Sequence, residues 1–305
     1  MTYKKIRVLY RTPFSSLPTA DQLFGQIVWA ISDLHGVQRA KEFVAGFDGK
    51  PPFLISAVIP EGFLPLPFYP PPSQIVATSS SERQKAKQNK KRKWIPLNSF
   101  YVLQHDPTQM RFLDFADSGP VMGEVVEEHV QIDRNTLRAA DGTLHAERYL
   151  FEKIPFVAYV AFEEERESEM GSILAEVCSY FGVIGLGGNR NVGKGACDVS
   201  CVELSEEEKK LFSFHDGTPQ SFMTLSRCSG KDLLDGAVAY SLTAYSGITG
   251  RSTSGFFNKK PVVGFEVGST FRSGTGGLVH GVNPDEKVCT YAYAFPVPLS
   301  LEVFA

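Results

Sequence analysis

The two halves of the chain open with the same order of predicted elements, a strand, a helix and a second strand. In the first half, residues 5–11 and 53–59 alternate as strands. The helix between them begins at Thr19, where Gln22 three residues later completes a capping box, and Gly36 can end it. Apolar side chains recur at helical spacing between these ends.

The second half repeats this order from about Tyr149. Residues 156–162 form a strongly apolar strand. An acidic run follows, and Ser168 is a candidate N-cap for a helix that continues to about Phe181. Strands and helices are therefore mixed without the regular alternation of a doubly wound sheet, which predicts an α+β fold of two sandwiches.

We divide the chain into an N-terminal domain, residues 1–148, and a C-terminal domain, residues 149–305. Residues from about 60 to 148 read as an insertion in the first domain, because the many prolines between Pro60 and Pro72 exclude a regular element there. Later in this insertion, residues 118–150 alternate as a hairpin with a turn at Asp141 and Gly142. The alternative is that this ribbon packs on its own domain as an ordinary sheet edge.

Composition favours a cytoplasmic protein with one basic segment. The chain has no run of 18 apolar residues for a membrane helix, and its five cysteines form no regular disulfide framework. Net charge is −3, yet the segment from Glu82 to Lys93 holds seven basic residues and one acid. Such a concentration is typical of a protein that contacts a polyanion in one place, although a solvated helix or loop would look the same.

Residues 185–195 carry the most specific chemistry. Five glycines allow the backbone to expose successive N–H groups as an anion-binding nest, and Arg190 and Lys194 add positive charge. The segment therefore predicts phosphate binding, with a tight connection that binds no ligand as the alternative.

This segment is not a nucleotide-binding motif. Residues 188–194 match the first seven positions of a P-loop, but Gly195 stands where a magnesium-binding Ser or Thr is required. The loop also follows a helix and leads into a strand, the reverse of a P-loop. The dinucleotide pattern that starts at Gly185 fails at Arg190. We therefore predict no cofactor.

In combination, several motifs resemble the RAMP superfamily of CRISPR proteins, and within it the fourth subunits of type III-A (Csm) interference complexes. The glycine-rich loop after an acidic amphipathic helix is the first of them. The others are Asp21 to Gly25, Val130 to Thr136 followed by Gly142 and Leu144, Ser246-Gly247, Lys260 to Val263 and Gly268-Ser269.

This resemblance implies two ferredoxin-like, RRM-like domains with an inserted β-hairpin thumb. It implies a subunit that binds the 5′ handle of the crRNA and contacts two partners, a large polymerase-type subunit and an adjacent backbone RAMP subunit. The RNA-cutting aspartate of such complexes belongs to the backbone subunit, so we expect no enzymatic activity here. The predicted RNA-binding residues are Gly187, Gly188, Asn189, Arg190, Asn191, Lys194, Arg134, Arg138, Arg251 and Lys260.

Two other functions stay open. Some relatives process crRNA with a histidine as general acid or base. His35 is a candidate for that role, although a histidine at a helix C-terminus is also favoured by the helix dipole. Asp21 and Asp33 could be a metal-dependent cutting pair, while Cys197 and Cys201 lack the second pair of ligands that zinc requires. The third possibility is a structural subunit that binds only protein.

Overall fold

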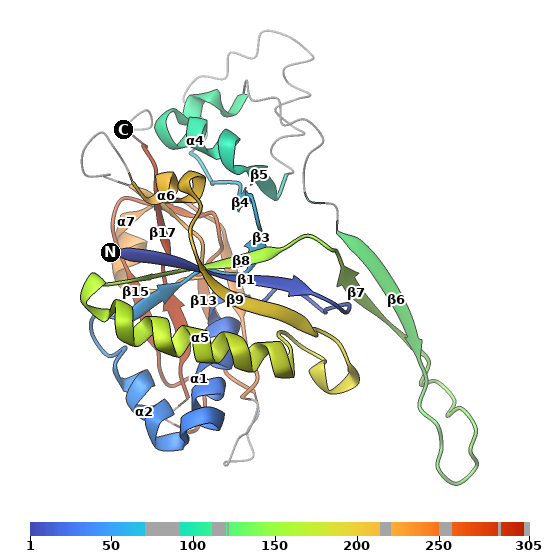
Figure 1. The fold of residues 1–305 in the computed structure, drawn as a ribbon. Coiled ribbons are helices and arrows are strands. Elements are labelled where there is room, and N and C mark those ends of the chain that lie inside the picture. The colour runs from blue at the N-terminus through green and yellow to red at the C-terminus, as the bar shows by residue number, and fades with distance from the viewer. Residues whose placement is uncertain are drawn as a thin grey trace.

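The central sheet of the molecule joins strands from both predicted halves (Figure 1). The computed structural model describes residues 1–70, 92–111, 120, 122–213, 221–249, 258–285 and 288–301. In this sheet β8 (Phe156–Phe162) and β1 (Thr2–Tyr10) lie in the middle, and β2 (Phe53–Ile55) and β9 (Cys197–Glu203) form the edges. All neighbours are antiparallel, and β3 (Ile59–Pro60) continues the edge beside β8.

The central sheet crosses the predicted boundary between residues 148 and 149. Strand β1 pairs with β8 on one side and β9 on the other, and both follow the boundary. Ile6, for example, lies opposite Ala158 and Cys201. The partners of β1 in the sheet are β8 and β9, which begin 154 and 195 residues after it, and local alternation does not reveal such a pairing.

Strand β8 is buried along its whole length because both faces of the sheet are covered. Its even-numbered side chains pack into a core with α1 (Ala20–His35), α2 (Val37–Ala45) and α5 (Glu167–Ile184). Its odd-numbered side chains pack into a second core with α4 (Leu97–His105) and α6 (Glu206–Phe212). A strand with two covered faces reads as a continuous apolar run, as this sequence does.

The predicted ends of the helices are confirmed for α1 and shifted for α5. The Gln22 side chain accepts a hydrogen bond of 3.2 Å from the Thr19 N–H, and Gly36 ends α1 with a φ of 89°. Helix α5 begins at Glu167, with Arg166 rather than Ser168 as its N-cap. The acidic run before it forms a 3-10 turn, η2 (Glu164–Arg166), that leads directly into the helix.

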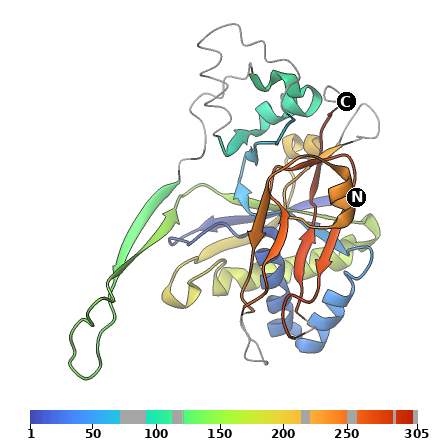
Figure 2. The same ribbon diagram turned by 180° about the vertical axis from the view of Figure 1, so that it is seen from behind.

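A second sheet lies on the other side of the second core, behind the central sheet in Figure 1 and in front of it in Figure 2. Its strand order is β11 (Ala237–Ala239), β14 (Thr270–Phe271), β10 (Phe222–Thr224) and β17 (Pro296–Pro298). Helix α7 (Lys231–Gly236) connects β10 to β11. The remaining elements of the body are the pairs β4 (Phe63–Pro65) with β5 (Trp94–Pro96), β12 (Leu242–Tyr245) with β13 (Val262–Phe265) and β15 (Gly276–Val279) with β16 (Thr290–Tyr293), and the 3-10 turn η1 (Pro107–Arg111).

A long hairpin of β6 (Gly123–His129) and β7 (His145–Phe151) projects from the body in both views (Figures 1 and 2). The predicted hairpin is thus present, and its turn includes Asp141 and Gly142. The ribbon is anchored at its base, where Phe14 and Leu150 exchange two backbone hydrogen bonds of 2.9 and 2.8 Å and Tyr149 is buried. Beyond this anchor the strands pair with each other.

Two further predictions fall partly outside the described residues. Of the basic segment, Arg92 and Lys93 are described, and the ammonium of Lys93 lies 5.3 Å from the centre of the Trp94 ring. Arg251 lies outside the described residues. No described helix is long and apolar enough to cross a membrane.

Candidate nucleic-acid interface

The glycine-rich loop leaves α5 at Gly185 and returns into β9, so it follows a helix and precedes a strand as predicted. Its neck is closed by the Leu186 N–H, which donates to the Gly195 carbonyl at 2.9 Å. A β-carbon on Gly195 would lie 2.5 Å from the Leu186 carbonyl oxygen, and Gly195 has a φ of 69°. Glycine is required there for both reasons.

The outer turn of the loop presents a row of free backbone donors. Asn189 takes a left-handed conformation, with φ 56° and ψ 26°, and the short turn η3 (Arg190–Val192) follows it. Within the described residues, no protein group accepts a hydrogen bond from the N–H groups of residues 188–191, and these residues are exposed. A left-handed residue followed by a right-handed turn is the geometry of an anion-binding nest.

Some charged and amide side chains of the loop are exposed, and others contact the hairpin. Arg190 and Asn191 are exposed, and Nη1 of Arg190 donates to the Gly185 carbonyl at 3.4 Å. Lys194 is 11% exposed, because its ammonium binds Glu127 of the hairpin and lies 4.4 Å from the centre of the Tyr149 ring. The structure therefore directs Lys194 toward the hairpin rather than toward solvent.

Asn189 makes the second contact with the hairpin. Its Nδ2 donates to Glu147 and to the Tyr149 hydroxyl, at 3.3 Å in each case. The Tyr149 hydroxyl donates in turn to Glu147, and this bond raises the pKa of Tyr149. Sequence reasoning missed Glu127, Glu147 and Tyr149. The alternate spacing of these residues on two predicted strands could have indicated a shared face. However, the register that places Glu127 opposite Glu147 depends on a long turn, which the alternation of polar and apolar residues does not determine.

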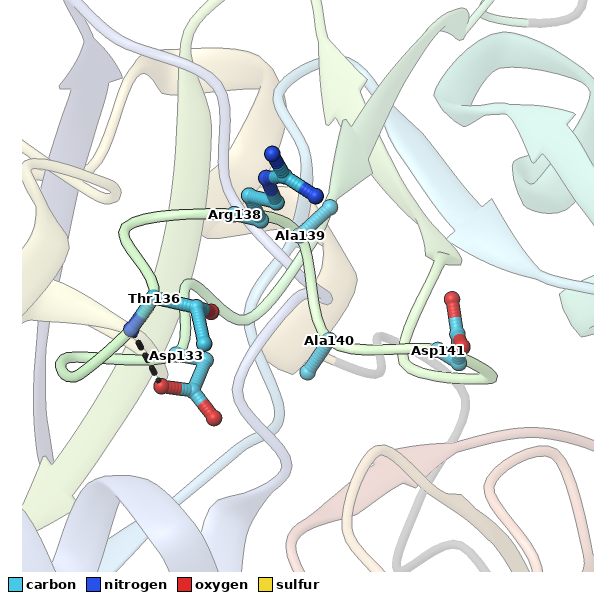
Figure 3. A pocket seen from close by; sticks show the side chains of 6 residues that line it. All are labelled: Asp133, Thr136, Arg138, Ala139, Ala140 and Asp141. Carbon is cyan, nitrogen blue, oxygen red and sulfur yellow. Dashed lines mark hydrogen bonds between the residues drawn. The ribbon is translucent and has the colours of Figure 1, made fainter.

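The predicted residues Arg134 and Arg138 lie at the far end of the hairpin. The Asp133 carboxylate accepts hydrogen bonds from the N–H groups of Asn135 and Thr136, at 2.8 and 2.9 Å, which shapes the tip (Figure 3). The bonds from Thr136 and Asn135 lower the pKa of Asp133. The Arg138 guanidinium is directed away from this turn in Figure 3. A hollow of about 650 Å³ at the tip is lined by Asp133, Thr136, Arg138, Ala139, Ala140 and Asp141.

The tip exposes apolar side chains as well as arginines. Leu137 is 80% exposed and has a φ of 55°, a left-handed backbone conformation that residues other than glycine rarely adopt. Two backbone hydrogen bonds of Asp133 hold this turn. The Leu137 N–H donates to the Asp133 carbonyl at 2.8 Å, and the Asp133 N–H donates to the Arg138 carbonyl at 2.9 Å. An apolar side chain held out in this way has no partner among the described residues of its own chain.

Lys260 is exposed, and its N–H donates to the Val282 carbonyl at 2.6 Å. The structure therefore joins the glycine-rich loop to the base of the hairpin and leaves Lys260, Arg134 and Arg138 at separate places.

Histidines at two places in the structure bear on the catalytic alternative. Nε2 of His35 lies 2.6 Å from Glu176 of α5, which ties α1 to α5. The rings of His129 and His145 stack across the hairpin with centres 5.5 Å apart. Among the described residues, no group of three or more His, Cys, Asp or Glu side chains could hold a metal ion.

Comparison with known proteins finds similarity to CRISPR proteins. No family model matches the chain. A curated relative from Thermococcus onnurineus (strain NA1), the "CRISPR system Cms protein Csm4", is 28% identical over 211 residues, which cover 65% of this chain and 68% of that protein.

Solved structures extend the likeness over the whole fold. A Csm1–Csm4 cassette in complex with AMPPNP matches with a TM-score of 0.61 at 18% identity, over 98% of each chain. A Csm3–Csm4 subcomplex of a type III-A interference complex matches with a TM-score of 0.62 at 13% identity, over 97% of this chain and 99% of that one. The predicted resemblance to the fourth subunits of Csm complexes is thereby confirmed.

Proposed function

We propose that this chain, a Csm4-type subunit of the RAMP superfamily, holds the 5′ handle of the crRNA within a type III-A interference complex in the cytoplasm. The observation that carries this proposal is the row of N–H groups at residues 188–191, which donate to no group of the described part of the chain and lie beside the exposed Arg190. Backbone donors with one arginine suit phosphate oxygens and read no base. The glycine-rich loop is thus the site for the handle backbone.

The partners follow from the relatives. One similar structure pairs Csm4 with Csm1, and another pairs it with Csm3. We assign to this chain the same two neighbours, the large subunit on one side and the first backbone subunit on the other. The chain then joins the two parts of the complex around the handle.

We assign two ferredoxin-like domains from the strand orders. In chain order, β1, α1, β2, β8, α5 and β9 follow the β-α-β-β-α-β pattern of that fold. The second sheet has the same arrangement, with its first strand β10 between β17 and β14 and its second strand β11 at the edge. In the second domain the hairpin β15–β16 stands where the second helix would be.

The projecting hairpin serves as the thumb. Leu137 at its tip is exposed in a hydrogen-bonded turn, and Arg134 and Arg138 supply positive charge beside it. An apolar side chain flanked by arginines suits insertion between stacked bases of a guide. This position would place the tip at the junction between handle and guide.

We assign no catalytic activity to the chain. The alternative, a crRNA-processing endoribonuclease, is favoured by one observation. The stacked rings of His129 and His145 lie 3.8 and 3.9 Å from Glu127 and Glu147, the two glutamates that contact the glycine-rich loop. Two histidines close to bound RNA could act as general acid and base. Incubation of the purified chain with repeat RNA distinguishes a non-catalytic subunit from a processing enzyme. Cleavage of the RNA that is lost in His129→Ala would establish processing.

The test of handle binding uses the assembled complex. Arg190→Ala should release crRNA at lower salt than the wild type, measured as the fraction of RNA retained on the purified complex. Arg39→Ala is the matched control, because Arg39 is an exposed arginine on α2 that lies beside Glu42 and Glu169. Equal retention in the two variants would refute the proposed site, and a chain that binds only protein would give the same result.

A further inference from the structure

Two glutamates of the hairpin contact the side chains of the glycine-rich loop that could bind a phosphate. Glu127 on β6 binds the ammonium of Lys194, and Glu147 on β7 accepts a hydrogen bond from Nδ2 of Asn189. Carboxylate and phosphate oxygens accept the same charge-assisted hydrogen bonds. In the free protein, both donors therefore hold an anion that belongs to the chain itself.

The same two glutamates repel each other. The register of the hairpin places Glu127 directly opposite Glu147, and like charges in that position destabilise a strand pair. The base of the hairpin tolerates them because Lys194 binds one carboxylate while Tyr149 and Asn189 donate to the other. The loop thus neutralises the hairpin, and the hairpin fills part of the loop.

We propose that Glu127 and Glu147 stand in for RNA phosphates on the glycine-rich loop and are displaced when a phosphodiester binds Lys194 and Asn189. This inference rests on the proposed function, because it takes the loop as the site of the handle backbone. The exchange favours phosphate because a phosphate between Lys194 and the nest also meets the free N–H groups of residues 188–191, which the hairpin glutamates leave without a partner.

The displacement has a mechanical result. When Lys194 turns to a phosphate, Glu127 faces Glu147 with no cation between them, and the base of the hairpin loses a tie to the body. Binding at the loop thereby frees the hairpin to reorient toward the same RNA. A site for the handle backbone and a tip for the guide are in this way coupled through one ion pair.

The experiment measures the affinity of the full-length chain for a short single-stranded RNA by fluorescence anisotropy at fixed salt. Glu127→Gln and Glu147→Gln should each bind about tenfold tighter, since a competing charged hydrogen bond is removed. Glu128→Gln is the matched control: it removes the same charge from the same strand, but alternation points residue 128 to the opposite face of the ribbon from residue 127. Its affinity should change less than about twofold.

A double variant makes the test specific. In a Lys194→Met background, Glu127→Gln should no longer tighten RNA binding, because the ammonium for which Glu127 and phosphate compete is absent. If Glu127→Gln and Glu147→Gln bind no tighter than Glu128→Gln, the inference is overturned. Arg190→Ala separates this failure from that of the proposed function. Unchanged RNA affinity in Arg190→Ala shows that RNA does not bind the loop. Weaker RNA binding by Arg190→Ala, without tighter binding by Glu127→Gln, refutes only the displacement of the glutamates.

Discussion

The ammonium of Lys5 lies 2.7 Å from Oε2 of Glu208, a residue 203 positions later in the chain. Their side chains are 8% and 2% exposed. Glu208 also accepts hydrogen bonds from the Tyr159 hydroxyl at 3.1 Å and the Ser205 N–H at 2.9 Å, and Lys5 binds Glu61 at 2.7 Å. This buried network connects β1, the turn between β3 and β4, and α6.

Loss of Lys5 should destabilise the fold strongly. Removing one partner of a buried ion pair leaves the other charge uncompensated, which costs roughly 3–5 kcal/mol. We expect Lys5→Met to lower the free energy of unfolding in urea by about 3 kcal/mol or more. The control is Lys4→Met, whose ammonium binds the more exposed Glu167 and Glu203 and should cost less than about 1 kcal/mol. Equal losses in the two variants would contradict a stabilising role for the network.

The same network sets two limits on stability against pH. Burial raises the pKa of Glu61, but hydrogen bonds from Lys5 and Arg7 outweigh burial and hold this pKa below its ordinary 4.5. Burial lowers the pKa of Lys5, but hydrogen bonds to Glu208 and Glu61 bring it above 10.5. The Glu61 carboxylate therefore stabilises the fold above pH 4.5, and this contribution is lost as pH falls through the pKa of Glu61 in the folded state. The Lys5 ammonium stabilises the fold below pH 10.5, and this contribution is lost as pH rises through the pKa of Lys5 in the folded state.

We accordingly expect the contribution of this network to be constant between these limits and to fall outside them. Glu61→Gln removes a group that titrates at the acid limit, so its unfolding free energy should fall less steeply below pH 4.5 than that of the wild type. The measurement is urea denaturation at a series of pH values. An identical acid slope in the variant would assign the acid limit to other carboxylates.

Salt dependence should report the phosphate contacts of the glycine-rich loop. Each phosphate contact to single-stranded RNA contributes about 0.7 to the slope of log affinity against log salt concentration. Arg190→Ala should reduce that slope by about 0.7, and Arg190→Ala with Lys194→Ala by about 1.4. Titrations with crRNA between low and physiological salt give the slope. A slope that both variants leave unchanged would show that neither side chain meets a phosphate.

Deletion of residues 134–144 should remove the hairpin tip and leave the body folded. The Phe14–Leu150 hydrogen bonds and the buried Tyr149 lie at the other end of the ribbon, so the unfolding transition should be unchanged. In the assembled complex, the chemical reactivity of nucleotides at the handle–guide junction should change. A wild-type reactivity profile would mean that the tip does not reach the RNA.

The neck of the glycine-rich loop should be more sensitive than its outer turn. Gly193 and Gly195 both have positive φ, 82° and 69°, so alanine costs about 1–2 kcal/mol of backbone strain at either position. At Gly195 the new β-carbon also meets the Leu186 carbonyl at 2.5 Å, whereas nothing lies within 4 Å at Gly193. We expect Gly195→Ala to lower stability and RNA affinity more than Gly193→Ala. The reverse order would show that the neck can open freely.

Local patterns predicted much of the fold and the loop. The capping box at Thr19, the apolar run of β8 and the glycines of residues 185–195 each act over a few neighbouring residues, and the structure places an element at each. The start of α5 was misplaced because the acidic residues before Ser168 form a 3-10 turn that continues into the helix. Here two local preferences competed within one turn.

Long-range pairings could not be predicted in this way. The position of β1 between β8 and β9, and the pairing of Lys5 with Glu208, depend on how distant segments meet. The same holds for Lys194, whose sequence context predicts a phosphate contact while the folded chain supplies Glu127 as its partner. A single sequence carries no direct signal for such contacts, because none of them leaves a periodic pattern.

The double burial of β8 has a consequence for synthesis on the ribosome. One face of this strand is covered by α1 and α2, which precede it, and by α5, which follows it; the other is covered by α4 and by residues as late as Val297 and Leu299. When β8 has been translated, part of the chain that must cover each face has not yet been made. The nascent protein therefore carries a partly covered apolar strand until these late residues emerge, and chaperone binding during translation should be concentrated on that stretch.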